Sequence, residues 1–242
     1  MRFFNLSFIF FILVWSCTTQ KEQTGEVRSE EEETVLSFQE EASVMNNFTI
    51  VQTDSVEFEK TKFTDNPFIN DASLITVLKD GISLSIDNSE NMILKDSITE
   101  YEAENFNYHF EGYNESLKQY LIAQVMYEDE RIFLVDKSSG KITTLWNRPI
   151  PDAQGRFIFN KQSNESLVYD YDLPFGFQIW EKQADSLTRV EEVRLKHNII
   201  IDGKWTPSGT LFIKSLPISE FLTKGEEATS GLTYYKILKK VK

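Results

Sequence analysis

The chain has 242 residues, of which 40% are hydrophobic and 13% aromatic, a composition typical of a folded domain and not of a disordered chain. Its formal net charge of −13 offers no electrostatic footprint for phosphate backbones, so we expect no nucleic-acid partner. Cys17 is the only cysteine, which excludes an intramolecular disulfide.

The first 17 residues have the features of a targeting signal. Arg2 precedes an apolar run over residues 8–15, which is shorter than the roughly 20 apolar residues needed to span a bilayer. The run therefore predicts a signal peptide over residues 1–16 and not a permanent transmembrane helix. Residues 13–17, Leu-Val-Trp-Ser-Cys, resemble the lipobox of bacterial lipoproteins. This resemblance implies that Cys17 carries the lipid, fatty acyl chains such as palmitate, and becomes the first residue of the mature protein.

Residues 17–43 are predicted to form the lipidated cysteine and an acidic flexible tether. Residues 18–41 contain eight glutamates, one lysine and one arginine. Such a segment buries too little apolar surface to offset the entropy lost on ordering. We therefore expect a single folded domain over residues 44–242. The acidic run also resembles the surface-export signals of Bacteroidetes lipoproteins.

Short β-prone runs separated by polar turns fill the rest of the chain and predict an all-β domain. The clearest unit is a hairpin at residues 131–146, in which two β-prone runs flank the turn at residues 136–140. Short helices are expected at residues 35–45 and 218–222. The predicted strands cover residues 55–60, 74–79, 82–86, 92–95, 106–113, 120–127, 132–135, 142–146, 157–160, 167–171, 177–181, 187–193, 199–202, 211–215 and 233–238.

The hairpin recurs along the chain, which favours a repeat architecture. Residues 87–93 match the hairpin turn at a shift of 49 residues, and the alignment places Asn91 where Gly140 lies. Gly140 is expected to adopt a positive φ, a conformation that asparagine tolerates better than other residues with a side chain. Residues 177–190 match residues 132–145 at a shift of 45 residues.

A second repeated element is a turn containing proline and glycine that leads into an apolar strand, at residues 151–159 and again at residues 206–213. Periods of about 40 to 50 residues with several strands each are typical of β-propellers. These residues resemble blades of TolB-like and WD-repeat proteins, and the layout of the chain resembles uncharacterised lipoproteins of Bacteroidetes. The resemblance implies a propeller-like array of about four short antiparallel blades, closed by pairing of residues 233–238 with an early strand. A β-sandwich or a curled meander is the alternative.

Sequence patterns for catalysis and metal binding are lacking. The two histidines, His109 and His197, lie far apart in the sequence and have no cysteine nearby, which argues against a histidine metal site. The sequence contains no P-loop and no Gly-x-Ser-x-Gly motif, and no serine stands at a recognisable spacing from a histidine. We therefore assign no catalytic, cofactor-binding or metal-binding residue.

Carboxylates leave one enzymatic alternative open. Glu100, Glu102 and Glu104 alternate along the chain, as do Asp170 and Asp172, so each set would share one face if it lay on a strand. Paired carboxylates are the machinery of glycoside hydrolysis, which makes a hydrolase one alternative function. A solvated strand face explains the same alternation.

The candidate binding site is a loop that contains Tyr169, Asp170, Tyr171, Asp172 and Phe175. Its aromatic side chains, next to carboxylates, are suited to stack on a sugar or to anchor a partner protein. We thus expect an exported, lipid-anchored cell-envelope protein, at the outer membrane or facing the periplasm of a Gram-negative cell. Its expected role is non-catalytic binding of an envelope protein or a glycan, and a structural or immunity-type lipoprotein is the other alternative.

Overall fold

The computed structural model describes residues 36–87, 89–101, 104–127, 129–162, 175–184, 186–225, 228 and 230–240. The chain divides into two compact units, Met1–Thr34 and Val35–Lys242, and every described residue belongs to the second unit. Cys17 lies outside the described residues.

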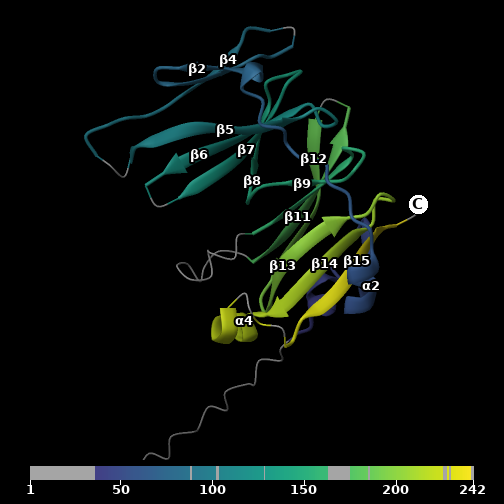
Figure 1. The fold of residues 1–242 in the computed structure, drawn as a ribbon. Helices are drawn as coiled ribbons and strands as arrows, with labels where there is room; N and C mark the ends of the chain where they lie inside the picture. The colour runs from purple at the N-terminus through teal and green to yellow at the C-terminus, as the bar shows by residue number, and fades with distance from the viewer. Residues whose placement is uncertain are drawn as a thin grey trace, which may run out of the picture. The chain divides into compact units, whose positions relative to one another are not determined.

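The second unit is built from strands, with a few short helices at its margins (Figure 1). The helices are α1 (Phe38–Ala42), α2 (Ser55–Lys60), the 3-10 helix η1 (Ala72–Leu74) and α4 (Ile218–Lys224). The strands are β1 (Phe48–Thr53), β2 (Ile75–Leu78), β3 (Gly81–Leu84), β4 (Met92–Lys95), β5 (Phe106–Asn114), β6 (Gln119–Met126), β7 (Glu130–Asp136), β8 (Ile142–Leu145), β9 (Ile150–Pro151), β10 (Phe157–Lys161), β11 (Phe175–Gln183), β12 (Ser186–Leu195), β13 (Asn198–Trp205), β14 (Leu211–Pro217) and β15 (Thr233–Lys239).

The strands form four antiparallel sheets that follow one another along the chain, which confirms the predicted all-β array. Sheet 1 has the order β2-β3-β4, sheet 2 has β5-β6-β7-β8, sheet 3 has β9-β10-β11-β12, and sheet 4 has β13-β14-β15-β1. The last strand of sheet 4 thus comes from the start of the domain. The predicted pairing of residues 233–238 with an early strand is confirmed, because β15 pairs with β1 and Ile237 lies opposite Ile50.

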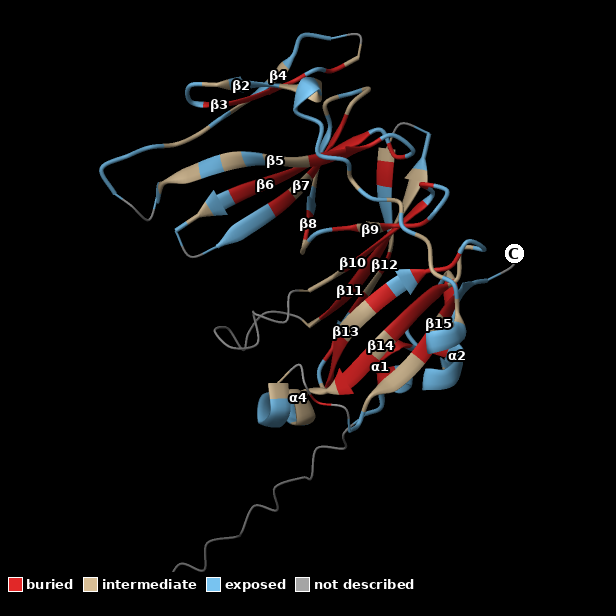
Figure 2. Cartoon of the chain, in the orientation of Figure 1, coloured by how far each residue is buried: buried red, intermediate tan, exposed pale blue. Residues whose placement is uncertain are grey.

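Apolar cores lie between consecutive sheets, so sheets 2 and 3 are covered on both faces (Figure 2). Residues 120–123 of β6 illustrate the consequence. Tyr120 and Ile122 contribute to the core shared with sheet 1, whereas Leu121 and Ala123 contribute to the core shared with sheet 3. Because neighbouring side chains on a strand point to opposite faces, a strand covered on both sides needs a continuous apolar run. This is why residues 120–123 of β6 do not alternate between apolar and polar side chains.

Helix α1 is part of the folded unit, although it lies within the stretch 17–43 that the sequence assigns to the tether. Ser37 and Glu40 form a capping box at its start, in which each side chain binds the other residue's backbone. Phe38 is 1% exposed and packs against Phe177 and Tyr235, so the helix covers the core between sheets 3 and 4. The expectation of a helix within residues 35–45 is confirmed.

The segment that follows α2 forms hydrogen bonds with three turns in succession, one each in sheet 4, sheet 3 and sheet 2. The backbone N–H of Thr64 donates to the carbonyl of Trp205 at 3.0 Å, and Asn66 Nδ2 donates to the carbonyl of Asp152 at 2.8 Å. Asn114 Nδ2 in turn donates to the carbonyl of Asn66 at 2.9 Å. These bonds join the turns that precede β14, β10 and β6, which include the repeated turns expected from the sequence.

Residues 55–60 form helix α2 and not the predicted strand. The alternation of Val56 and Phe58 with polar residues resembles a strand over so short a stretch, but Asp54 accepts a hydrogen bond from the N–H of Glu57 at 2.7 Å and begins a helix. The strand of this region is β1, immediately upstream.

The expected match of Asn91 to Gly140 is also wrong in conformation, because Gly140 has φ 72° while Asn91 is not among the described residues with positive φ.

Candidate functional site

The connections β4–β5, β6–β7 and β8–β9 leave sheet 2 at the same end, because its strands alternate in direction. We use the name loop edge for five residues of these connections and of the strands beside them: Tyr101, Glu111, Tyr127, Glu130 and Arg148. Loops on a rigid scaffold are common places for recognition residues. The loop edge is therefore the part of the described structure that we consider as a site.

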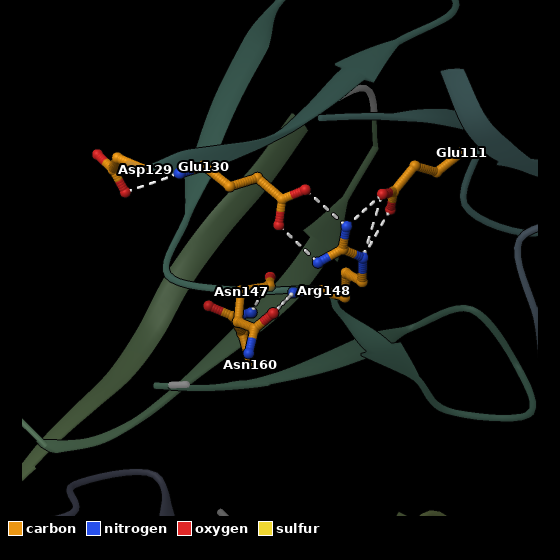
Figure 3. A network of polar contacts seen from close by, with 6 residues as sticks. All are labelled: Glu111, Asp129, Glu130, Asn147, Arg148 and Asn160. Carbon is orange, nitrogen blue, oxygen red and sulfur yellow. Dashed lines mark hydrogen bonds and ion pairs between the residues drawn. The ribbon is translucent and has the colours of Figure 1, made fainter. Parts of the chain in front are cut away.

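Arg148 is the central charged residue of the loop edge (Figure 3). Its guanidinium binds Glu111 of β5 through Nε at 2.9 Å and through Nη2, and it binds Glu130 of β7 through Nη1 at 2.7 Å and Nη2 at 2.8 Å. The hydrogen bonds to Glu130 and then to Glu111 raise the pKa of the guanidinium above its ordinary value, against the effect of burial. The guanidinium thus ties the two strands that flank β6 while 48% of the Arg148 side chain stays exposed.

The backbone that carries Arg148 is fixed from below by Asn160 of β10. Asn160 is completely buried, accepts a hydrogen bond from the N–H of Trp146 at 2.9 Å and donates one to the carbonyl of Asn147. Asn147 Oδ1 accepts from the N–H of Arg148 at 2.7 Å. Two successive sets of hydrogen bonds therefore fix the backbone at Arg148.

A second polar cluster lies on sheet 3. Gln178 is 2% exposed, accepts a hydrogen bond from Trp180 Nε1 at 3.2 Å and donates one to Glu192 at 3.2 Å. Glu192 also binds Arg189 and Arg194. Burial opposes ionisation of Glu192, but the hydrogen bond from Gln178 and the neighbouring guanidinium groups outweigh it and hold the pKa of this carboxyl below its ordinary value.

Large side chains are exposed on the connections of the loop edge. Tyr101 is 72% exposed and Tyr127 is 61% exposed. Ile98, in the same connection as Tyr101, is 80% exposed. The connection at Tyr127 is closed by a hydrogen bond from the N–H of Met126 to the carbonyl of Asp129 at 2.8 Å. Tyrosine combines an apolar ring with a hydroxyl that can bind water or a partner, and it is enriched at interfaces for this reason.

The predicted binding loop falls mostly outside the described residues, which include neither Tyr169, Asp170, Tyr171 nor Asp172. Phe175 is described and is the first residue of β11, where its half-buried side chain packs against two apolar cores. It is a structural residue of the sheet and not a free loop aromatic.

The remaining candidates are dispersed. His109 is exposed on β5, while His197 is half-buried in the turn between β12 and β13. Glu100 and Glu104 are exposed in the β4–β5 connection and not on a strand, and Glu102 lies outside the described residues. Within the described ranges, no three histidine, cysteine or acidic side chains gather as a metal site would require.

Arg148 and its partners were not expected from the sequence, because its two glutamate partners lie 37 and 18 positions away. One local signal was present. Gly112 interrupts a β-prone run, and such a glycine often marks a bulge. The structure has an irregularity between Phe110 and Gly112, and the extra residue there is Glu111.

Comparison of the chain with models of protein families, with curated proteins and with solved structures gave no match. Among the residues that the structure describes, no helix is both long enough and apolar enough to cross a membrane.

Proposed function

We propose that the chain is an exported cell-envelope protein, anchored through a lipid on Cys17, whose β domain binds another envelope protein or a glycan without catalysing a reaction. The support for the anchor is the sequence of residues 13–17, in which small Ser16 precedes the single cysteine. The acidic segment that follows separates the membrane from the domain.

The observation that carries the binding function is the combination of a fixed cation with exposed aromatics at one end of sheet 2. Arg148 is held by two carboxylates, and Tyr101 and Tyr127 are 72% and 61% exposed on connections at the same end of the sheet. Tyrosine and arginine are enriched among the residues that dominate binding energy, since they offer large contact areas with few rotatable bonds. A side chain that is already ordered loses little entropy on binding.

The carboxylates of the loop edge favour binding over hydrolysis. A glycoside hydrolase needs two carboxyl groups of different pKa, one protonated and one free to act on the substrate. Glu111 and Glu130 are instead both engaged by the guanidinium of Arg148, from opposite sides (Figure 3). Their role in this arrangement is to position the arginine.

The binding function is tested with the full chain on a glycan array and against envelope extract of the source cells. We expect a retained glycan or a specific envelope protein, and at least about tenfold weaker retention by the double variant Tyr101→Ala/Tyr127→Ala. Val56→Ala is the matched control, because Val56 is 54% exposed on α2, away from the loop edge. Absence of any retained component, or equal loss in the Val56 control, would contradict the proposal.

The anchor is tested separately by partitioning cell lysate between water and a detergent phase. The wild-type chain should enter the detergent phase because of its acyl chains. Cys17→Ser lacks the thiol that would accept the lipid, and its uncleaved signal would remain in place, so electrophoresis should also show a longer chain. A wild-type chain of precursor length in the aqueous phase would contradict the anchor.

A further inference from the structure

Strand β1 lies at the edge of sheet 4, with β15 on one side only. The N–H of Lys240 donates to the carbonyl of Asn47 at 2.8 Å, which fixes the alternation of hydrogen bonds along this pair of strands. Since Asn47 points its backbone groups toward β15, so do Thr49, Val51 and Thr53. The backbone donors and acceptors of Phe48, Ile50 and Gln52 therefore point away from β15, along the open edge.

The sequence of β1 has none of the features by which proteins protect an open edge. Its residues, Phe-Thr-Ile-Val-Gln-Thr, include no charge and no proline, and its pairing with β15 has no bulge. The edge strands β5 and β13 each contain a charged residue and an irregular register. The edge strands β2 and β8 are also uncharged but have only four residues each. Among the described edge strands, β1 is thus the longest one without protection.

The longest of the described edge strands, β12, has ten residues and is partly covered. The carbonyl of Val190 accepts a hydrogen bond from Asn47 Nδ2 at 3.0 Å, and the Glu191 carboxylate accepts from the N–H groups of Asn46 and Asn47. Helix α1 packs beside the same strand. The segment that precedes β1 therefore binds the edge of sheet 3. Helix α1 also contacts β1, but no described residue forms a hydrogen bond with the outward backbone groups of this strand.

The space beside β1 is hollow. A groove of about 230 Å³ runs between α1 and the strand, lined by Gln39, Ala42, Ser43, Met45, Phe48, Thr49, Ile50 and, from the far end of the β15 side, Lys240, whose ammonium group donates to the carbonyl of Met45. Its walls belong to the helix on one side and to the strand on the other. Side chains of an added strand would have room there, next to Phe48 and Ile50.

We propose that the open edge of β1 binds β1 of a second copy of this chain, as an antiparallel pair centred on Ile50. This register sets Phe48 of each copy opposite Gln52 of the other, so all three outward-pointing residues form backbone hydrogen bonds. The two four-stranded sheets become one continuous sheet. A second copy fits this edge because β1 has no charged residue that would repel its own image in an antiparallel pair.

Sedimentation velocity over a range of concentrations tests the assembly, with residues 18–242, which lack the signal and Cys17, so that no apolar signal, lipid or native thiol interferes. We expect a dimer for this chain. Val51→Lys places a charge on the edge strand at a site that is 39% exposed, and should leave a monomer with an unchanged circular dichroism spectrum. Val56→Lys is the matched control on α2 and should remain a dimer.

Gln52→Pro is a second variant, because it removes an outward N–H while the bonds to β15 persist, and it should also yield a folded monomer. A chain that is monomeric at every concentration would overturn the proposal. So would a Val51→Lys chain that dimerises as well as the Val56→Lys chain.

Disulfide trapping tests the register. Around Ile50, Thr49 of one copy faces Val51 of the other as a non-hydrogen-bonded pair, with Cα atoms about 4.5 Å apart, within disulfide range. A mixture of Thr49→Cys and Val51→Cys chains should therefore oxidise to a covalent dimer, and Thr49→Cys alone should not. Efficient cross-linking of Thr49→Cys with itself, or none in the mixture, would refute this arrangement.

Discussion

The docking of α1 gives the sharpest prediction about stability. The carboxylate of Glu41 is 8% exposed and accepts hydrogen bonds from the N–H groups of Lys196 and His197, at 2.6 and 3.0 Å, and from Asn198 Nδ2 at 2.9 Å. Glu41→Ala removes this acceptor from two backbone amides in the turn between β12 and β13. An unsatisfied buried amide costs about 1–3 kcal/mol, so we expect a loss of about 2–4 kcal/mol in the free energy of unfolding.

Urea unfolding followed by tryptophan fluorescence measures the effect, since Trp205 is fully buried. With a slope of about 2 kcal/mol per molar urea, the midpoint of Glu41→Ala should fall by about 1–2 M. Glu41→Gln keeps one oxygen for the two amides and should lose about 1 kcal/mol. Glu40→Ala is the control on the same helix, because the Glu40 carboxylate caps the helix from an exposed position and its loss should lower the midpoint less. A Glu41→Ala midpoint no lower than that of Glu40→Ala would refute the docking of α1.

Three further predictions concern other parts of the fold. A Cβ at Gly203 would lie 2.3 Å from the ring of Phe159, so Gly203→Ala should lower the free energy of unfolding by about 1–3 kcal/mol, and adding Phe159→Leu should restore part of it. Burial opposes ionisation of Glu181, but hydrogen bonds from cationic neighbours outweigh it and hold the pKa of this carboxyl below its ordinary value. The ionised carboxylate therefore stabilises the fold above the ordinary carboxyl pKa, and this contribution is lost as the pH falls through the lowered pKa. The difference in urea stability between wild type and Glu181→Gln should close on acidification. Asn160→Ala should speed hydrogen exchange at the Trp146 amide, and unchanged exchange would mean that Asn160 does not hold the loop.

The sequence was sufficient to predict the class of fold, because its signals are local. The hairpin at residues 131–146 could be placed by its turn chemistry, and the strands β7 and β8 confirm it. The Asp136 carboxylate accepts from the N–H groups of Ser138 and Ser139, at 3.0 and 2.8 Å, as a turn-forming aspartate does. The helix expected after Pro217 is α4.

The start of the domain was harder to predict, because local preference and tertiary packing compete there. Over six residues, the alternation of Val56 and Phe58 fits either a strand or a short helix, and the cap at Asp54 decides for the helix. The stretch around Phe38 is rich in glutamate and reads as a tether. It folds because Phe38 has an aromatic pocket and Glu41 has backbone donors, both supplied by residues more than 100 positions away.

The lysines near the C-terminus show the same dependence on distant partners. Lys236, Lys239 and Lys240 stand close together in the sequence, which gives no sign of their partners. In the structure Lys236 binds Glu57 of α2, Lys239 binds Glu181 of sheet 3, and Lys240 donates to the carbonyl of Met45. The loop edge could not be predicted for this reason either, since the partners of Arg148 come together only once sheet 2 has formed.

Metabolic labelling most directly tests the central claim, which is that Cys17 anchors this protein to a membrane. Cells producing the full chain are grown with an alkyne-bearing palmitate analogue, and the purified chain is examined for the label. We expect label on the wild-type chain and on Ser16→Ala, which keeps a small residue before the cysteine, and none on Cys17→Ala. Equal labelling of Cys17→Ala and wild type, or an unlabelled wild-type chain, would contradict this claim.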